Sequence, residues 1–337
     1  MAATMDIEAF WEHIFSDDRD SVLRAWRDID AEERASVHEL LVRIQDDPDR
    51  IDAQRTAAAF AARCIYDAAV GEDSLPVGAL DFARNLARDV GQLLHKNFGL
   101  NLASLKRDGT LVTESDLESD RLIHDAVLAR YPDHRVLSEE RQKVYDGAEW
   151  SWLIDPIDGT TNFAHGFPCW GVLIALLYHG QPVLGVADFP ALSEHFYALR
   201  GSGAFLNDQP IRAAESAPAA FESTQIIAMC SRTVESGPVA LPGKVRVSGS
   251  SGYDLALLAS GVAAVTIQSR VYPWDIAAGW VLSQEAGAII EGLPVADVFP
   301  LRRGADCGNL RFAVVGGASV QIVNVAKKTI MNHFVVA

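Results

Sequence analysis

The sequence predicts a mixed α/β protein in which layered sheets and helices follow a helical extension. Two patterns support this fold class. From Leu80 onward, short apolar segments alternate with amphipathic ones, which favours layers of sheet and helix over a solenoid. Residues 1 to 75 are instead rich in Asp, Arg and Ala and nearly free of Gly, which is typical of helix. The chain has 337 residues, of which 49% are hydrophobic, so it can bury a large core.

The extension, residues 1 to 75, should contain at least two helices. Asp30 followed by Glu33 indicates a capping box, and the helix it opens carries an apolar stripe of Leu40, Leu41 and Ile44. A second helix is expected over residues 54 to 69. Glycine and proline between residues 70 and 78 predict a linker.

A first half of the main body is expected over residues 76 to 215. Phe82, Leu86, Val90, Leu94 and Phe98 recur at four-residue intervals and mark one face of a long helix. A second helix is expected over 115 to 131. Closely spaced apolar segments then predict antiparallel strands, and Asn207-Asp208 predicts a hairpin turn. These strands are placed at 152–154, 171–178, 182–187, 195–199 and 204–206.

The second half, residues 216 to 337, alternates strand and helix patterns. Strands are expected at 226–230, 245–248, 264–268 and 312–316, and helices at 253–260, 275–286 and 320–332. The alternation predicts a further sheet covered by helices.

Charge and cysteine content restrict the function. The formal net charge of -16 repels nucleic acid and anionic membranes, so neither is expected as a partner, and a phosphorylated substrate would require bound cations. The four cysteines lie far apart without a CxxC pair, which indicates reduced thiols. No window approaches the roughly 18 apolar residues of a membrane span, and no export signal opens the chain. We therefore expect a cytoplasmic protein.

The run from Trp152 to Phe163 carries the most chemistry. An apolar strand leads into Asp155, Pro156 fixes the backbone, and Asp158 follows three residues later. These two carboxylates and the Ile157 carbonyl offer the oxygen ligands that Mg²⁺ prefers. Alone, such a run is also typical of a solvated turn. The next residues favour a site, because Gly159 permits a tight turn and the three residues after it can open a short phosphate-binding helix.

Two more acidic segments indicate a function only when they are considered together. Taken alone, Glu139 and Glu140 are typical of a solvated pair, and Asp275 is typical of a helix N-cap. The acidic pair, the run from Asp155 to Phe163 and the run from Trp274 to Gly279 occur, however, in the order and spacing of one family. Over residues 80 to 330 the chain resembles the inositol monophosphatase family of magnesium-dependent phosphatases. Further agreement lies at 111–116, 165–168, 201–206 and 249–251.

The resemblance implies a layered α-β-α-β-α sandwich and a set of site residues. It makes Glu139, Asp155, Asp158, Asp275 and the Ile157 carbonyl the ligands of two or three Mg²⁺ ions. The implied catalytic residues are Thr160 and Asp116, which position the attacking water, together with Glu139. Gly159 and Thr161 would bind phosphate. Lys106 lies near the position of the family's lysine, but its spacing to Asp116 is one residue shorter. Thr110 stands where many relatives have Asp.

The sequence says less about the alcohol that carries the phosphate. The resemblance implies substrate contacts around Gly249, Ser250 and Ser251, and at a Glu position that Gln268 occupies here. This departure weakens the case for myo-inositol 1-phosphate. Arg246 and Arg270 are candidates for binding a second anionic group, although both are also typical of surface salt bridges.

The sequence thus predicts a magnesium-dependent phosphomonoesterase that hydrolyses a small sugar, polyol or related metabolite phosphate by attack of water. Histidinol-phosphatase and fructose-1,6-bisphosphatase activity on the same scaffold are the alternatives. A regulatory binding protein is a further hypothesis, but every expected carboxylate is present. A nucleotidyl or phosphoryl transferase lacks its glycine-rich loop. The resemblance also implies a homodimer.

Overall fold

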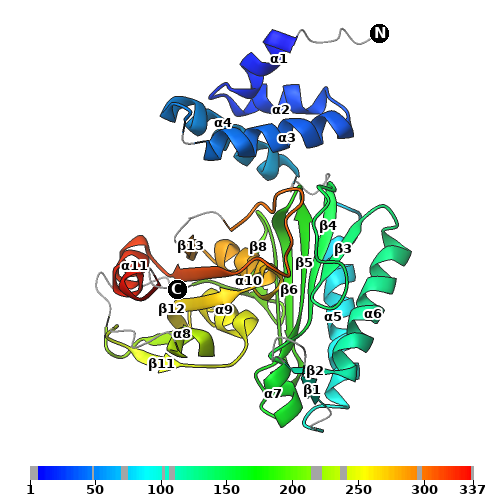
Figure 1. The fold of residues 1–337 in the computed structure, drawn as a ribbon, viewed down its shortest axis with the longest axis vertical. Coiled ribbons are helices and arrows are strands. Elements are labelled where there is room, and N and C mark those ends of the chain that lie inside the picture. Colours follow the sequence, from blue (N-terminus) through cyan, green and yellow to red (C-terminus); the bar gives the residue numbers. More distant parts are fainter. Residues whose placement is uncertain are drawn as a thin grey trace.

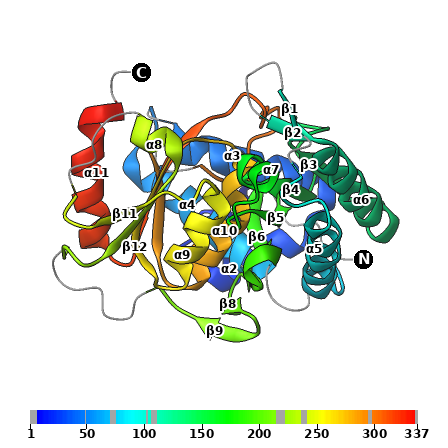
Figure 2. The ribbon, with the colours of Figure 1, turned by 90° about the horizontal axis from the view of Figure 1, so that it is seen from below.

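A computed structural model describes residues 7–47, 49–69, 75–100, 103–105, 111–213, 222–235, 241–293 and 298–334. The main body consists of five layers, which run from helix pair to sheet to helix pair to sheet to helix pair (Figure 1). Seen from below, α5 and α6 lie on one side, α9 and α10 in the middle, and α8 and α11 on the other side (Figure 2). The predicted α-β-α-β-α sandwich is confirmed.

The N-terminal extension forms a helical layer beyond one end of the sheets (Figure 1). Its helices are α1 (Ile7–Ile14), α2 (Arg19–Arg27), α3 (Ala31–Asp46) and α4 (Asp52–Ala69). Asp30 and Glu33 form the expected capping box at the start of α3. Of the predicted linker, residues 70–74 lie outside the described residues.

The first outer layer is the pair α5 (Ala79–His95) and α6 (Glu114–Arg130). Both helices pack against a seven-stranded sheet, α5 through an apolar stripe that includes the buried Val90 and Leu94. A short hairpin of β1 (Ala103–Leu105) and β2 (Leu111–Thr113) joins them. Both helices lie where their apolar repeats predict them.

The seven-stranded sheet has the order β3-β4-β5-β6-β7-β8-β9. Its strands β4 to β9 pair antiparallel, as the short connections predict, while β3 runs parallel to β4. Asn207 and Asp208 have φ of 48° and 65°, which is the left-handed backbone of the predicted hairpin turn. The strands are Arg135–Ser138, Trp150–Asp158, Gly171–Tyr178, Gln181–Phe189, Glu194–Leu199, Gly203–Leu206 and Gln209–Ile211. The 3-10 turn Pro190–Leu192 lies between β6 and β7.

The middle layer contains α9 (Ser251–Ala259) and α10 (Pro273–Glu285), which pack on each other between the two sheets. Helix α10 lies very close to β6. A Cβ atom built on Gly185 would lie 2.4 Å from the Ala278 carbonyl oxygen, so only glycine allows this approach.

The second sheet is mixed and has the order β11-β10-β12-β14-β13. Strands β10, β11 and β12 are parallel, and β14 pairs antiparallel with both β12 and β13. Helices α8 (Ser231–Glu235) and α11 (Val320–Phe334) form the last layer. The strands are Ile226–Met229 (β10), Lys244–Arg246 (β11), Ala263–Val271 (β12), Ile289–Leu293 (β13) and Phe312–Gly317 (β14).

All four cysteines are free thiols, as their spacing predicts. No helix in the described ranges combines the length and apolarity that crossing a membrane requires.

Candidate active site

Two buried aspartates lie at the carboxyl end of β4. The register against β5 pairs Asp155 with Leu173 and Asp158 with Gly171, so β4 carries one extra residue there. Pro156 lies within this bulge and has no N–H to donate to the ladder. The bulge therefore interrupts regular pairing at the site and brings both carboxylates to one edge of the sheet.

Asp158 also binds the start of α9. Its carboxylate accepts hydrogen bonds from the amides of Ser251 at 3.2 Å and Gly252 at 2.8 Å, and from the hydroxyl of Ser250, the N-cap of this helix. A carboxylate at a helix N-terminus meets unpaired amides and the positive end of the helix dipole. Asp158 thus joins the first sheet to the middle helical layer.

The turn after Asp158 requires glycine. Gly159 has φ of 83°, and a Cβ atom there would lie 2.9 Å from the Cys169 carbonyl oxygen. The short helix α7 (Thr160–His165) begins directly after it, as the sequence predicts.

Thr160 and Asp116 meet beneath this turn. The Thr160 hydroxyl lies 3.2 Å from Asp116 Oδ1 and 3.1 Å from the Ile157 carbonyl oxygen. Asp116 belongs to the capping box of α6, and its Oδ2 accepts the Thr113 amide at 2.7 Å. Its second oxygen is thereby held toward Thr160.

Asp275 and Glu139 complete the acidic set. Asp275 lies in the first turn of α10, where its carboxylate accepts the Tyr272 amide at 2.9 Å. Glu139 directly follows β3 and is half-buried. Because β3 runs parallel to β4, their carboxyl ends bring Glu139 beside the Asp155 turn.

These carboxylates line one cavity of about 510 Å³. One wall of the cavity is formed by Ile157, Gly159, Thr160 and Thr161. Another wall is formed by Gly249 and Ser251. The remaining lining residues are Asn162, Cys230, Ser231, Arg232, Glu235, Ser269, Val271 and Tyr272. Asp116 and Ser250 lie just beneath the lining, bonded to Thr160 and Asp158.

Burial and crowding raise the pKa of every buried carboxyl in this set. Burial is the main cause for Asp155, whose pKa lies well above 3.8, and the charges of Glu139 and Asp158 raise it further. Burial likewise raises the pKa of Asp275 to about 8 and the pKa of Asp158 to about 6, although three hydrogen bonds lower the latter. Asp116 has a pKa of about 6 for the same reason. When these carboxyls are ionised, their burial and mutual repulsion destabilise the metal-free protein. A bound cation would neutralise this charge.

The donor set fits magnesium. Glu139, Asp155, Asp158, Asp275 and the Ile157 carbonyl supply oxygen only, which is the chemistry of a hard divalent cation. Among the described residues, no group of three or more His, Cys, Asp or Glu side chains lies close enough together to hold a metal ion as it stands. The three aspartates instead accept backbone N–H groups of Ile157, Ser251, Gly252 and Tyr272.

Not every residue expected at the substrate faces the cavity. The Gln268 side chain is fully buried and donates to Asp254 Oδ2 at 2.9 Å and to the Thr266 hydroxyl at 2.8 Å. Arg246 and Arg270 are exposed, and neither is part of the cavity lining. Lys106 and Thr110 lie outside the described residues.

Arg232, Glu235 and Asp254 were not predicted from the sequence. Arg232 and Glu235, on α8, line the cavity, and Arg232 donates to the Arg270 carbonyl oxygen at 2.7 Å. The positive charge of Arg232 acts on Asp275 and lowers its pKa slightly. Asp254 is fully buried next to Gln268. None of the three lies in a segment with a recognisable motif. Only folding brings α8 and the start of α10 to the same cavity.

Comparison with known proteins agrees with this geometry. The model of the inositol monophosphatase family matches residues 78–316. A fructose-1,6-bisphosphatase/inositol-1-monophosphatase of Thermotoga maritima is 35% identical over 224 residues, which cover 63% of this chain and 83% of the relative. A histidinol-phosphatase of Chlorobaculum parvum is 38% identical over 218 residues, or 62% and 83% of the two chains.

Solved structures give the same result. The structure of an IMPase from Thermotoga maritima superposes with a TM-score of 0.64 at 29% identity and covers 76% of this chain and 99% of its own. The inositol monophosphatase of Anabaena superposes with a TM-score of 0.60 at 27% identity. The match covers 75% of this chain and 95% of that structure. The family match begins after the helical extension. This chain therefore belongs to the inositol monophosphatase family and is a phosphoric monoester hydrolase.

Proposed function

We propose that the chain hydrolyses a small sugar, polyol or related metabolite phosphate with Mg²⁺ held by Glu139, Asp155, Asp158, Asp275 and the Ile157 carbonyl. One observation carries the proposal: carboxylates from three distant segments line a single cavity together with Gly159, Thr160 and Thr161. Two or three Mg²⁺ ions bound there would supply the positive charge that a phosphate dianion and its attacking water require.

Thr160 and Asp116 are the groups that move the proton of the water. The Thr160 hydroxyl donates to Asp116 Oδ1, 3.2 Å away, so its lone pairs accept a hydrogen from a water in the cavity. As the water attacks phosphorus, its proton passes to Thr160 Oγ1, and the Thr160 proton passes to Asp116. The pKa of Asp116, which burial raises to about 6, makes this carboxylate a better proton acceptor than an ordinary aspartate.

The phosphate lies against the start of α7 in this mechanism. Gly159 and Thr161 flank Thr160 in the cavity lining, and the first amides of a helix have no partner within that helix. Glu139 follows β3, lines the same cavity and completes the ligand set around the attacking water. The alkoxide leaves toward the wall formed by Gly249 and Ser251, with Ser250 fixing that wall through Asp158.

Arg232 favours a sugar bisphosphate as the second candidate substrate. It is the arginine of the cavity lining, and its guanidinium can bind a second phosphate. The Thermotoga maritima relative is named for both fructose-1,6-bisphosphatase and inositol-1-monophosphatase activity. Gln268, buried on β12, donates to Asp254 and so ties α9 to the second sheet.

A phosphate-release screen tests the proposal. The substrates are myo-inositol 1-phosphate, histidinol phosphate, fructose 1,6-bisphosphate and adenosine 3',5'-bisphosphate, each assayed with Mg²⁺ and with EDTA. We expect release from at least one substrate, its loss in EDTA and its return with Mg²⁺. Arg232→Ala should raise KM for a bisphosphate more than for a monophosphate. Release that persists unchanged in EDTA contradicts the magnesium assignment.

We also infer a cytoplasmic homodimer. The absence of a disulfide among the four free cysteines is compatible with a reducing compartment. Light scattering of the purified chain should give twice the monomer mass of 36.5 kDa, and a monomer mass would refute the dimer.

A further inference from the structure

Glu139 is the one acidic residue of the cavity that lies in a connection between two strands. Strand β3 ends at Ser138, and residues 139 to 149 lead from there to the start of β4. Because β3 and β4 run parallel, this segment has to return along the whole length of the sheet. The position of Glu139 therefore depends on contacts that hold the segment in place.

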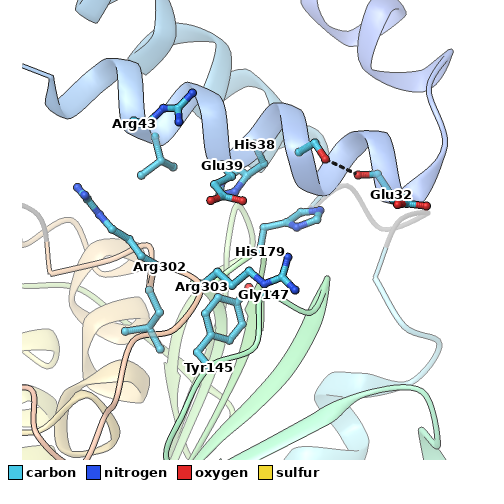
Figure 3. Close-up of a pocket in the computed structure, with 12 residues that line it drawn as sticks. Glu32, His38, Glu39, Arg43, Tyr145, Gly147, His179, Arg302 and Arg303 are labelled. Atoms are coloured by element: carbon cyan, nitrogen blue, oxygen red, sulfur yellow. Dashed lines mark hydrogen bonds between the residues drawn. The ribbon is translucent and has the colours of Figure 1, made fainter.

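The far end of the segment is attached to a loop of the main body. The Tyr145 amide donates to the Ala305 carbonyl at 2.9 Å, and the Gly304 amide donates to the Tyr145 carbonyl at 2.7 Å. The Arg303 side chain packs 3.1 Å from the Cβ position of Gly147. Tyr145, Gly147 and Arg303 lie together at the sheet end that faces α3 (Figure 3). These contacts are at the opposite end of the sheet from the catalytic cavity, so they do not fix the near end of the segment.

The near end of the segment is a tight turn. The Ser138 amide donates to the Gln142 carbonyl at 2.9 Å and closes the turn that contains Glu139. Arg141 extends from the same turn to α6, where its Nε lies 2.6 Å from Asp120 Oδ2. This ion pair connects the turn to a helix of the outer layer.

Asp120 is buried in a way that requires this partner. It is 1% exposed, whereas the Arg141 side chain is 40% exposed. Apart from Arg141, no residue in the described part of the chain donates a hydrogen bond to either carboxylate oxygen of Asp120. An ionised carboxylate buried in this way is strongly unfavourable unless a positive charge lies beside it. The two side chains are therefore held to each other.

The helix face that carries Asp120 also carries Asp116. The two aspartates are four residues apart on α6, so they lie on one face, one turn apart. Asp116 Oδ1 lies 3.2 Å from the Thr160 hydroxyl. Burial raises the pKa of Asp116, and the charges of Glu139 and Glu140 raise it further. The turn after β3 thus lies close to this face of α6.

We propose that Asp120 is a positioning residue for Glu139. The inference rests on the proposed function, since it takes Glu139 as a ligand of Mg²⁺. Asp120 holds Arg141, and with it the turn, against α6. It also keeps the guanidinium paired, two residues away from Glu139. Once released from Asp120, this guanidinium can pair with the Glu139 carboxylate and compete with the metal for it.

Asp120→Asn tests the proposal, because asparagine keeps the shape of the side chain and removes its charge. Manganese binding, followed by electron paramagnetic resonance, should weaken roughly 10- to 100-fold at one site. The Mg²⁺ concentration that gives half-maximal phosphate release should rise by a similar factor. The kcat at saturating Mg²⁺ should change less, since excess metal competes with the freed guanidinium for Glu139.

Arg141 provides a second test, which stays decisive even if Asp120→Asn does not fold, because its side chain is 40% exposed. Arg141→Lys keeps the positive charge and should bind manganese within about three-fold of the wild type, whereas Arg141→Gln should weaken binding as Asp120→Asn does. The double variant Asp120→Asn with Arg141→Gln should bind no more weakly than the weaker single variant, because the two residues act as one unit. Losses that multiply in the double variant would overturn the proposal.

The ion pair of Arg135 and Asp146 is the matched control. Arg135 Nε lies 2.9 Å from Asp146 Oδ2, and the two side chains are 54% and 49% exposed. This pair joins β3 to the far part of the same segment. Asp146→Asn should therefore leave manganese binding unchanged. Equal weakening in Asp146→Asn and Asp120→Asn would show only a general effect of lost negative charge, and it would contradict a special role of Asp120.

Hydrogen exchange in EDTA separates positioning from a loss of overall stability. Asp120→Asn should accelerate amide exchange in residues 138 to 142 at least roughly ten-fold and leave β4 and β5 unchanged. Acceleration throughout the sheet would show that Asp120 only stabilises the fold.

The manganese measurement also separates this inference from the proposed function. A wild type that binds no manganese would overturn both. A wild type that binds manganese, with an Asp120→Asn variant that binds it as tightly, would overturn this inference alone.

Discussion

The position of the Thr160 hydroxyl decides how water is activated. It lies 3.2 Å from Asp116 Oδ1, and Asp116 is fixed by two bonds to Thr113. Valine has the shape of threonine but no hydroxyl, so Thr160→Val interrupts the proton path. We expect kcat to fall roughly 10²- to 10⁴-fold with a smaller change in KM. Thr160→Ser keeps the hydroxyl and should recover most of the rate in the phosphate-release assay. Equal losses in both variants would show that the hydroxyl has no such role.

The buried carboxyls predict how stability depends on pH. The pKa values of Asp116 and Asp158 are raised to about 6, and that of Asp275 to about 8, from 3.8 in an unfolded chain. A raised pKa means that the folded chain holds protons that the unfolded chain has already released. Stability from these groups is therefore present at low pH and is lost as pH rises from about 4 to about 8.

We expect the melting temperature in EDTA to fall by at least about 4 °C between pH 5 and pH 8. Mg²⁺ should raise it more at pH 8 than at pH 5, because cations bind the ionised carboxylates. Asp275→Asn removes the carboxyl with the highest of these three pKa values and should flatten the fall in EDTA. A melting temperature that rises over this range would contradict the account.

At the scale of elements, the contact between α10 and β6 positions Asp275. A Cβ atom at Gly185 would lie 2.4 Å from the Ala278 carbonyl oxygen and 2.9 Å from Ala278 Cα, both backbone atoms. Gly185→Ala must therefore push α10 from the sheet and move Asp275 away from Asp155. We expect a loss of about 1 to 3 kcal/mol in stability and a fall in kcat.

Gly243→Ala is a suitable control for that change. The nearest atom there is the flexible end of the Ile227 side chain at 2.7 Å, in the other sheet and away from α10. This variant should lose stability without loss of kcat. If Gly185→Ala also kept its full kcat, α10 would not set the position of Asp275.

Most elements of the main body could be predicted from the sequence, because their apolar periods are clear. Strand β5 has the expected bounds, and α10 begins two residues before its expected start. Strands β3 (RVLS) and β13 (IIEGL) were not predicted, since polar residues or glycine interrupt their apolar runs. Helices α1 and α2 were covered only by the general expectation of helix over residues 1 to 75.

At the scale of the whole molecule, the acidic residues of the cavity were predictable and part of its wall was not. Glu139, Asp155, Asp158 and Asp275 lie in motifs and do line one cavity. Gln268 was assigned from its position in a motif, yet its side chain points into a buried network with Asp254. Arg232 belongs to no motif and reaches the cavity only because β10 and β12 are neighbours. Contacts of this kind depend on sheet order, which local patterns do not encode.

The extension and the catalytic cavity lie at opposite ends of the sheet. Deleting residues 1 to 75 should therefore leave kcat/KM within about three-fold. The same deletion should lower the melting temperature, because Trp26 and Leu41 belong to the apolar cluster that includes Trp152 and Tyr178. Thermal unfolding and phosphate release of the shortened chain check both outcomes. A folded but inactive product would show that the extension is part of the catalytic unit.

The central claim is that carboxylates from distant segments bind divalent cations together. Manganese binding, counted by electron paramagnetic resonance in place of magnesium, tests it most directly. The account predicts two or three bound ions in the wild type and weaker binding by at least roughly ten-fold in both Glu139→Gln and Asp275→Asn. A wild type that binds no manganese, or an Asp275→Asn variant that binds it as tightly as the wild type, would contradict the account.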